Sequence, residues 1–315
     1  MAILSSILNV VNCAFTDLLG GGELGCGFDF ANLKHVRFWK KGFVVPSNAD
    51  YNKSYLREQQ QAGNLVVVLN DLYDFTWNIG EDAREQAEST GLNSTTRKGI
   101  YGLSIKRRKG LYDQKVLNAL DGGNFDVQLI DENGNELWTE TSTGGAKGFT
   151  TSMIAVDPIM FANGTTSQKT GITIEFSNSN QFNKSLTWTL AENLNYLPEE
   201  VSGANQAALS IPTAPSDSDT TFSVKTVLAR GGEFITGLVV GNFLVKVNGS
   251  TVTPSSVVAE PTNKAYTVTV SALSTGDAIE ASLYDTANTS SIIIINPGAD
   301  DVLYKSNTAT TSVVA

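Results

Sequence analysis

The sequence predicts a mainly β protein: an N-terminal β-sandwich or barrel-like sheet domain with one or two short helices, followed by a C-terminal β-sandwich. The chain has 315 residues, which exceeds one typical domain of roughly 100–200 residues. Short apolar segments, alternating or rich in β-branched residues, are separated by Gly, Asn and Pro turn signals. Charged residues make up 17% of the chain, against roughly 25% in ordinary soluble domains. The balance is Ser, Thr, Asn and Gly, which suits β proteins with large buried or shared surfaces.

We interpret residues 1–45 as an N-terminal arm or interface segment. Glycines between residues 20 and 27 exclude a helix there, and residues 35–45 have the pattern of a strand. The first lysine is Lys34, so no basic region precedes the apolar start and we expect no signal peptide. No segment reaches the ~20 apolar residues that a membrane helix needs, so we expect no membrane insertion. Four apolar residues of the arm are candidates for subunit contacts: Ile3, Ile7, Val10 and Phe15.

Possible chemical sites near the N-terminus have simpler explanations. The motif Gly20-x-Gly22-x-x-Gly25 matches a dinucleotide fingerprint, but a strand follows it where that fingerprint needs a helix. Cys13 and Cys26 could form one disulfide, although we favour two reduced thiols. His35 is the only histidine and has no local carboxylate, so we expect a surface or interface residue rather than a catalytic one. A zinc site built from these three side chains matches no standard spacing.

Residues 46–190 are expected to form a β-rich core domain. The first part predicts helical turns at 55–61, a strand buried on both faces at 65–69 and a polar helix at 81–89. A strand at 100–105 and an amphipathic helix at 111–120 follow. The remaining predicted elements are a hairpin at 125–138 with a type I′ turn at Asn133-Gly134, and strands at 149–156, 172–176 and 186–190.

The hairpin turn also has the spacing of the first half of a calcium-binding loop. Oxygen-bearing side chains stand at Asp131, Asn133 and Asn135. The glycine is at the fourth position rather than the sixth, and Ser142 stands where a bidentate glutamate is needed. Because a β-turn explains the same residues, we predict no metal site and no cofactor.

The C-terminal part is organised as a linker, a sandwich and a tail. Prolines among Ser, Ala, Asn and Asp indicate a linker at 191–218. Short strands with regular turn signals at 219–305 predict a β-sandwich, with one hairpin turn at Asn248-Gly249. Residues 306–315 are expected to be a mobile tail, or to add to the sheet edge of a neighbour.

A basic cluster is the most specific electrostatic feature of this chain, whose net charge is −10. It contains 7 of the 22 Lys and Arg residues within 19 positions. It can be a solvated loop, a docking patch for an acidic partner subunit, or a site of sequence-independent contact with phosphates. The cluster supplies the other subunit-interface candidates: Arg97, Lys98, Lys106, Arg107, Arg108, Lys109 and Lys115.

Residues 125–138, followed by Lys147-Gly148-Phe149, resemble the sheet-and-helix core of tail-tube and neck-ring subunits of tailed bacteriophages. The sandwich at 219–300 is similar to the immunoglobulin-like domains appended to phage head and tail proteins. The resemblance implies a non-enzymatic structural subunit of the virion, assembled in the bacterial cytoplasm. It would form a homo-oligomeric ring or tube, contact other virion proteins, and carry an outward immunoglobulin-like domain.

The net negative charge suits a tube through which DNA passes without sticking, although DNA would lie close by. The basic cluster should then face a subunit interface rather than the lumen. Two alternatives remain open. One is a capsid decoration or receptor- or glycan-binding virion protein. The other is a carbohydrate-active enzyme with an accessory sandwich, which needs two facing carboxylates that no motif identifies.

Overall fold

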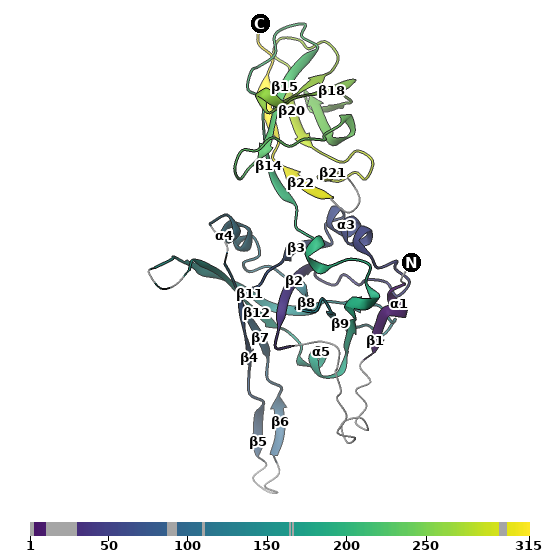
Figure 1. Ribbon diagram of the computed structural model, residues 1–315, viewed down its shortest axis with the longest axis vertical. Helices are drawn as coiled ribbons and strands as arrows, with labels where there is room; N and C mark the ends of the chain where they lie inside the picture. Colours follow the sequence, from purple (N-terminus) through teal and green to yellow (C-terminus); the bar gives the residue numbers. More distant parts are fainter. Residues whose placement is uncertain are drawn as a thin grey trace. The chain divides into compact units, whose positions relative to one another are not determined.

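The computed structural model describes residues 3–10, 30–86, 93–108, 111–163, 165, 167–295 and 301–315 (Figure 1). The protein is mainly β, as predicted, and divides into two compact units, Met1–Ser202 and Gly203–Ala315. Among the described residues, no helix combines the length and the apolar character needed to cross a bilayer.

The first unit is built on an eleven-stranded sheet that folds over at one strand. Its strands are β1 (Leu8–Val10), β2 (Leu33–Lys40), β3 (Leu65–Leu69), β4 (Asp74–Ile79), β7 (Tyr101–Arg107), β8 (Phe125–Asp131), β9 (Glu136–Glu140), β10 (Ala146–Lys147), β11 (Phe149–Met160), β12 (Lys169–Phe176) and β13 (Leu186–Thr189). The main path is β1-β13-β9-β8-β11-β12-β7-β4, β2 joins β8 to β3, and β10 pairs with β9.

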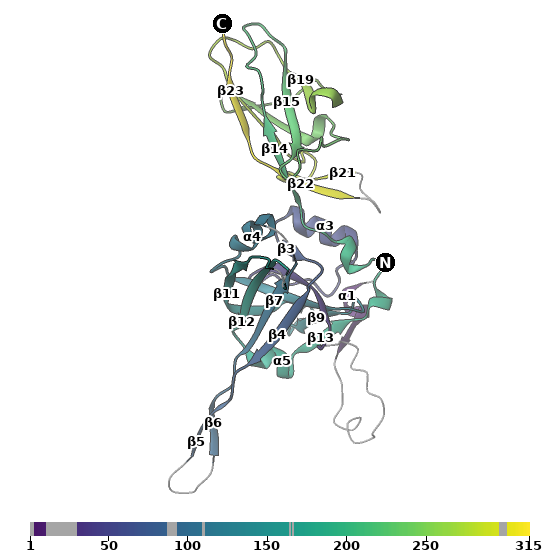
Figure 2. The ribbon, with the colours of Figure 1, turned by 60° about the vertical axis from the view of Figure 1, so that its left-hand side comes forward.

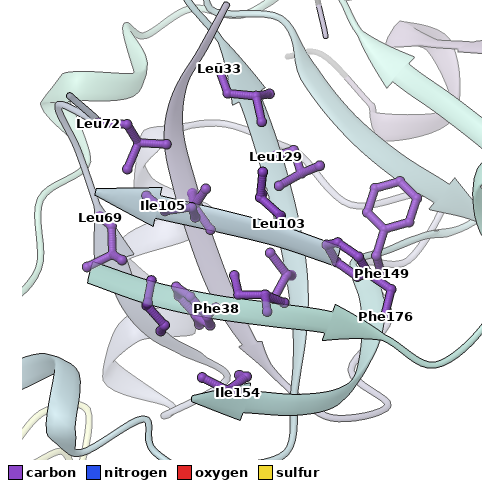
Figure 3. Close-up of a cluster of buried hydrophobic side chains, with 14 of the residues drawn as sticks. Leu33, Phe38, Leu69, Leu72, Leu103, Ile105, Leu129, Phe149, Ile154 and Phe176 are labelled. Carbon is purple, nitrogen blue, oxygen red and sulfur yellow. The ribbon is translucent and has the colours of Figure 1, made fainter. Parts of the chain in front are cut away.

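Strand β11 connects the two halves of this sheet. Its first residues, Phe149 and Thr150, pair with β8, and the rest of the strand pairs with β12. The first half contains β2, β8, β9 and β13, and the second half contains β11, β12, β7 and β4. Apolar residues of both halves meet in one core, in which Phe38, Ile105 and Phe149 are fully buried (Figure 3). The fold is therefore a sandwich-like sheet that folds over so that its two halves pack against each other.

Short helices and turns cover the first unit. They are α1 (Leu4–Ile7), α3 (Lys53–Gln61), α4 (Leu111–Asn118), α5 (Ser179–Lys184), and the 3₁₀ turns η1 (Ala191–Asn193) and η2 (Pro198–Glu200). The expected helices at 55–61 and 111–120 are confirmed as α3 and α4. Helix α3 begins at Asn52, whose side chain accepts a hydrogen bond from the Tyr55 amide at 2.9 Å.

The first half of the sheet is buried on both faces. Successive side chains of a strand point to opposite sides, so Val36 and Phe38 enter the first core while Arg37 and Trp39 enter a second one. In this second core, Trp39 packs against Trp138 with ring centroids 5.8 Å apart. Segments 43–56 and 194–201 cover it, and both contribute buried residues.

A fully buried ion pair lies beside the second core. Arg37 Nη1 and Glu136 Oε1 are 2.5 Å apart, and both side chains are completely inaccessible to solvent. The same carboxylate accepts hydrogen bonds from Tyr51 Oη at 2.6 Å, Tyr196 Oη at 2.7 Å and Gln128 Nε2 at 2.7 Å. Burial and the nearby Glu136 charge raise the pKa of both tyrosines, so they remain protonated donors at neutral pH.

Several local predictions for the first unit were wrong. Residues 33–40, which the sequence groups with an N-terminal arm, form β2 in the interior of the sheet. The strand at 65–69 pairs only with β2, and its Val66 side chain is 45% exposed, so it is not buried on both faces. Residues 81–89 were expected to form a helix, but β5 (Ala83–Gln86) pairs with β6 (Asn93–Arg97) in a hairpin.

The turn at Asn133-Gly134 also differs from the prediction. Gly134 has a positive φ of 85°, but Asn133 does not, so the turn is not type I′. The amide of Gly134 bonds to the Asp131 carbonyl, and the Asp131 amide bonds to the Asn135 carbonyl. This longer connection allows the Asp131 carboxylate to accept hydrogen bonds from both the Asn135 amide and its side chain.

The second unit is a sandwich of two sheets. The six-stranded sheet has the order β18 (Ser256–Glu260), β19 (Ala265–Thr269), β15 (Thr221–Leu228), β14 (Asn205–Ser210), β22 (Val302–Ser306), β21 (Ile292–Ile295). The four-stranded sheet has the order β17 (Ser250–Val252), β16 (Phe243–Val247), β20 (Ala278–Leu283), β23 (Ala309–Ser312). Short 3₁₀ turns lie at η3 (Val240–Asn242) and η4 (Pro261–Asn263).

Residues of both sheets, among them Val224, Val268, Val245 and Ile279, form the single core of the second unit. The turn at Asn248-Gly249 is confirmed: both residues have positive φ, and two residues connect β16 to β17.

The expected linker and tail are parts of the folded units. Tyr196 and Val201 are buried in the first unit, while β14 is an interior strand of the second. The carbonyl of Ser202 accepts hydrogen bonds from Arg57 and Gln60, both at 2.8 Å, which ties the end of the first unit to α3. Strand β23 pairs with β20 of its own chain, and Ala309 and Val313 are buried. Turn-rich composition marks irregular backbone but does not show whether that backbone is packed.

We expect Glu136→Ala to lower the free energy of unfolding of the first unit by about 3–5 kcal/mol, because it leaves the Arg37 charge buried without a partner. All four tryptophans lie in this unit, so tryptophan fluorescence during urea unfolding reports on it alone. Lys98→Ala is the control, because the Lys98–Asp82 pair is largely exposed and should contribute less than about 1 kcal/mol. Equal losses for the two variants would contradict the structural role of the buried pair.

Candidate functional site

A β-hairpin arm extends from the second half of the sheet. Strands β4 and β7 pair from Asp74–Lys106 to Ile79–Tyr101, and the chain then continues into β5 and β6. These two strands form a separate two-stranded sheet that projects away from the remainder of the unit (Figure 2). We call these two strands, together with the residues that join them to β4 and β7 (80–86 and 93–100), the arm.

The base of the arm is a joint made from two glycines and one carboxylate. The Gly80 amide donates to the Ile100 carbonyl at 2.9 Å. Asp82 accepts hydrogen bonds from the Gly99 amide at 2.8 Å and from Lys98 Nζ at 2.9 Å. A Cβ atom on Gly99 would lie 1.7 Å from the Gly80 carbonyl oxygen, so only glycine allows the two strands to cross here.

Hollows lie on both sides of this joint. The first has a volume of about 550 Å³ and is lined by Trp77, Asn78, Ile79, Gly80, Ile100, Gly102, Thr173 and Glu175. The second has a volume of about 510 Å³ and shares Ile79 and Gly80 with the first. Ile79 is 65% exposed and Ile100 is 45% exposed, so two aliphatic side chains stand in solvent between the hollows.

The floor of the first hollow is the outer face of β4, β7 and β12. Gly102 has no side chain to fill it, and polar groups of adjacent strands are linked across it. Asn78 Nδ2 donates to Ser104 Oγ at 3.2 Å, and Ser104 Oγ lies 3.2 Å from Thr173 Oγ1. This hollow therefore combines a polar floor with an apolar rim.

Strand β4 also presents a free edge. It lies at the end of the strand order and pairs only with β7 within the described part of the chain. Backbone N–H and C=O groups on such an edge can pair with a strand from another chain. The arm, the hollows and this edge are adjacent, and together they form the candidate interaction surface.

The predicted basic cluster does not form one patch. Arg107 is buried and makes an ion pair with Asp113, and its Nη2 donates to the Asn70 carbonyl at 3.1 Å. Burial lowers its pKa, against the effect of Asp113. Lys98 belongs to the joint of the arm, and Arg108 covers the Tyr73 ring at 3.5 Å from its centroid. Lys106 is half-buried on β7, and Lys115 is exposed on α4.

Two members of the cluster have no described side chain. Arg97 is part of β6, where only the backbone is described, and Lys109 lies outside the described residues. The cluster's role as an interface stays a prediction, but Arg107 has a local structural explanation that a sequence run of basic residues does not reveal.

The four apolar interface candidates at the N-terminus also differ in their burial. Ile7 is buried in the second core of its own chain, whereas Ile3 is 47% exposed. Val10 lies in β1, where its side chain is not described, and Phe15 lies outside the described residues. Among these candidates, the described structure places Ile3 alone on the surface.

The residues considered for chemistry are held in structural contacts. His35 is buried, its Nδ1 lies 3.1 Å from Asn70 Oδ1, and burial lowers its pKa. Asp131 is buried and bonds Asn135 within the hairpin turn. Within the described ranges there is no group of three or more His, Cys, Asp or Glu side chains positioned to hold a metal ion. Cys13 and Cys26, and the glycine motif at 20–25, lie outside those ranges.

Comparisons with known proteins identify no family for this chain. No protein-family model matches the chain, and no curated protein matches it. One solved structure with weak similarity is SGBP-B of the mixed-linkage glucan utilization locus of Bacteroides ovatus, in complex with a mixed-linkage heptasaccharide. The TM-score is 0.18 at 10% identity, over 85% of this chain and 67% of that one.

We expect Gly99→Ala to open the joint of the arm without unfolding the core, because the added methyl group collides with the Gly80 carbonyl. Hydrogen–deuterium exchange should be faster across residues 79–101, with an unchanged midpoint of tryptophan-detected unfolding. Gly102→Ala is the matched control, because its nearest neighbour would be 3.3 Å from the new Cβ. Unchanged exchange in Gly99→Ala would show that the two strands do not cross as described.

Proposed function

We propose that this chain is a non-enzymatic structural subunit that assembles with copies of itself, in a ring or tube of a phage tail or neck. The observation that supports this proposal is the arm. A lone two-stranded hairpin is marginally stable in water. Residues 81–98 are predominantly polar and offer no apolar face that would stabilise the hairpin alone. An arm of this kind gains its stability from contact with another chain.

The geometry of the surface favours assembly between different patches of identical chains. The arm and the free edge of β4 lie together at one end of the sheet. Among the described strands, the other end strand of the main path, β1, carries no such arm. Contacts between unlike patches are heterologous, and they produce closed rings or open helical tubes. The assignment to a phage tail or neck rests on the sequence resemblance at residues 125–149, and not on this geometry.

The test is to remove the arm while preserving the sheet. Ile79 and Tyr101 are paired residues, so replacing residues 80–100 with Asn-Gly joins β4 to β7 by a two-residue hairpin turn. We expect the full-length chain to sediment as a multimer, with rings or tubes in negative-stain images. The shortened chain should be a monomer with an unchanged midpoint of tryptophan-detected unfolding. A shortened chain that assembles like the full-length one would contradict the role of the arm.

A second candidate function is glycan binding at the first hollow. Amide, hydroxyl and carboxylate groups of Asn78, Thr173 and Glu175 line this hollow. The exposed aliphatic side chains of Ile79 and Ile100 stand at its rim. Polar groups of this kind can bond sugar hydroxyls, while apolar side chains contact the apolar face of a sugar ring.

Titration calorimetry with soluble β-glucan and bacterial surface oligosaccharides tests this alternative. Binding that is lost in Asn78→Ala and Glu175→Ala, but kept in the exposed control Glu192→Ala, would support it. Absence of heat at millimolar oligosaccharide would count against a glycan site.

A further inference from the structure

The loop between β11 and β12 forms an apolar tip at the opposite end of the second half of the sheet. Met160 is 53% exposed and Phe161 is 70% exposed, the largest exposed fraction among the large apolar side chains of the described residues. Figure 1 shows this connection extending beyond the body of the first unit. A phenylalanine and a methionine together on a projecting connection form an exposed apolar pair that folding of this chain does not bury.

The tip and the first hollow lie at opposite ends of strand β12. Strand β12 begins at Lys169, beside the tip, and carries Thr173 and Glu175 into the hollow. Six residues of extended strand separate Lys169 from Glu175, which is roughly 20 Å. Strand β12 is paired on both sides, with β11 and with β7, so it cannot bend to bring the two ends together. Within one chain the tip cannot enter the hollow.

We propose that the Phe161 tip of one chain inserts into the first hollow, beside Ile79 and Ile100, of a second copy of this chain. The inference rests on the proposed function and names the surfaces that would join its subunits. The hollow's volume of about 550 Å³ falls in the roughly 300–1,000 Å³ range of pockets that enclose small organic groups. The exposed side chains of Ile79 and Ile100 at its rim provide apolar contacts for an aromatic ring.

The charges next to the tip and in the hollow also favour this contact. Lys169 stands next to the tip, and Glu175 lies in the hollow, so docking brings opposite charges towards one another. The contact is heterologous, because a tip meets a hollow. One chain then keeps an unused hollow and the other keeps an unused tip. Repetition of this contact adds chains head to tail, which is the arrangement that a ring or tube requires.

Two single variants and their mixture test the proposal. Phe161→Asp disables the tip, and Ile79→Asp disables the hollow; both positions are highly exposed, so the fold should be retained. We expect each variant alone to sediment as a monomer where the unmodified chain assembles. Their equimolar mixture should give dimers and nothing larger, because one intact tip meets one intact hollow. Leu197→Asp, which is 57% exposed in the same unit, is the control and should assemble normally.

The milder pair Phe161→Ser and Ile79→Ser is used if circular dichroism shows that an aspartate variant has not folded. Each serine variant should weaken association by about tenfold or more. Normal assembly of Phe161→Asp, together with a monomeric chain lacking the arm, would overturn the tip contact and leave the proposed function standing. Two monomeric variants that form no dimer on mixing would show that tip and hollow do not meet. An unmodified chain that is monomeric at every concentration would overturn both proposals.

Discussion

The buried Arg37–Glu136 pair is the contact on which the arrangement of the first unit depends. It joins β2 to β9, and the tyrosines on the same carboxylate attach segments 43–56 and 194–201 to this face. Removing two charges from water is costly, and the cost is offset only when their hydrogen-bonding groups are satisfied in one geometry. A one-residue slip of β2 would move Arg37 into the apolar first core, so the pair also specifies the strand register.

This constraint determines which surfaces remain for other molecules. The covering segments bury the second face of β2, β8 and β9, so that half of the sheet is enclosed. The other half, made from β11, β12, β7 and β4, carries a polar outer face, a free edge, the arm and the Phe161 tip. One half of the sheet is therefore enclosed on both faces, and the other half carries the exposed surfaces on which we base our proposals.

Local patterns in the sequence predicted most of the strands and helices. They did not predict which strands pair with one another. Short apolar segments predicted β2, β8 and β12, and Asn248-Gly249 specified its turn because both residues adopt positive φ readily. Residues 81–89 are rich in Ala, Glu and Gln, which favour a helix, yet Ala83–Gln86 form one strand of a hairpin. Strand pairing with residues 93–97 outweighs that weak preference. Pairing of β23 with β20 is equally non-local and was missed for the same reason.

Less of the candidate site than of the fold could be predicted from the sequence. The basic run pointed to the right part of the chain, since Lys98 belongs to the joint, but not to the burial of Arg107. The hollows depend on missing side chains at Gly80 and Gly102 and on strands that meet only in three dimensions. One usable signal was present: Gly80 and Gly99 bracket a polar segment symmetrically between two apolar strands, which is the pattern of a hairpin that crosses at its base.

The central claim is that this chain is a subunit whose exposed surfaces are completed by copies of itself. Sedimentation velocity of the unmodified full-length chain, from micromolar to the highest attainable concentration, tests it most directly. The account predicts a concentration-dependent shift from monomer to a species of several copies, seen as rings or tubes by electron microscopy. A single monomeric species over the whole concentration range would contradict it.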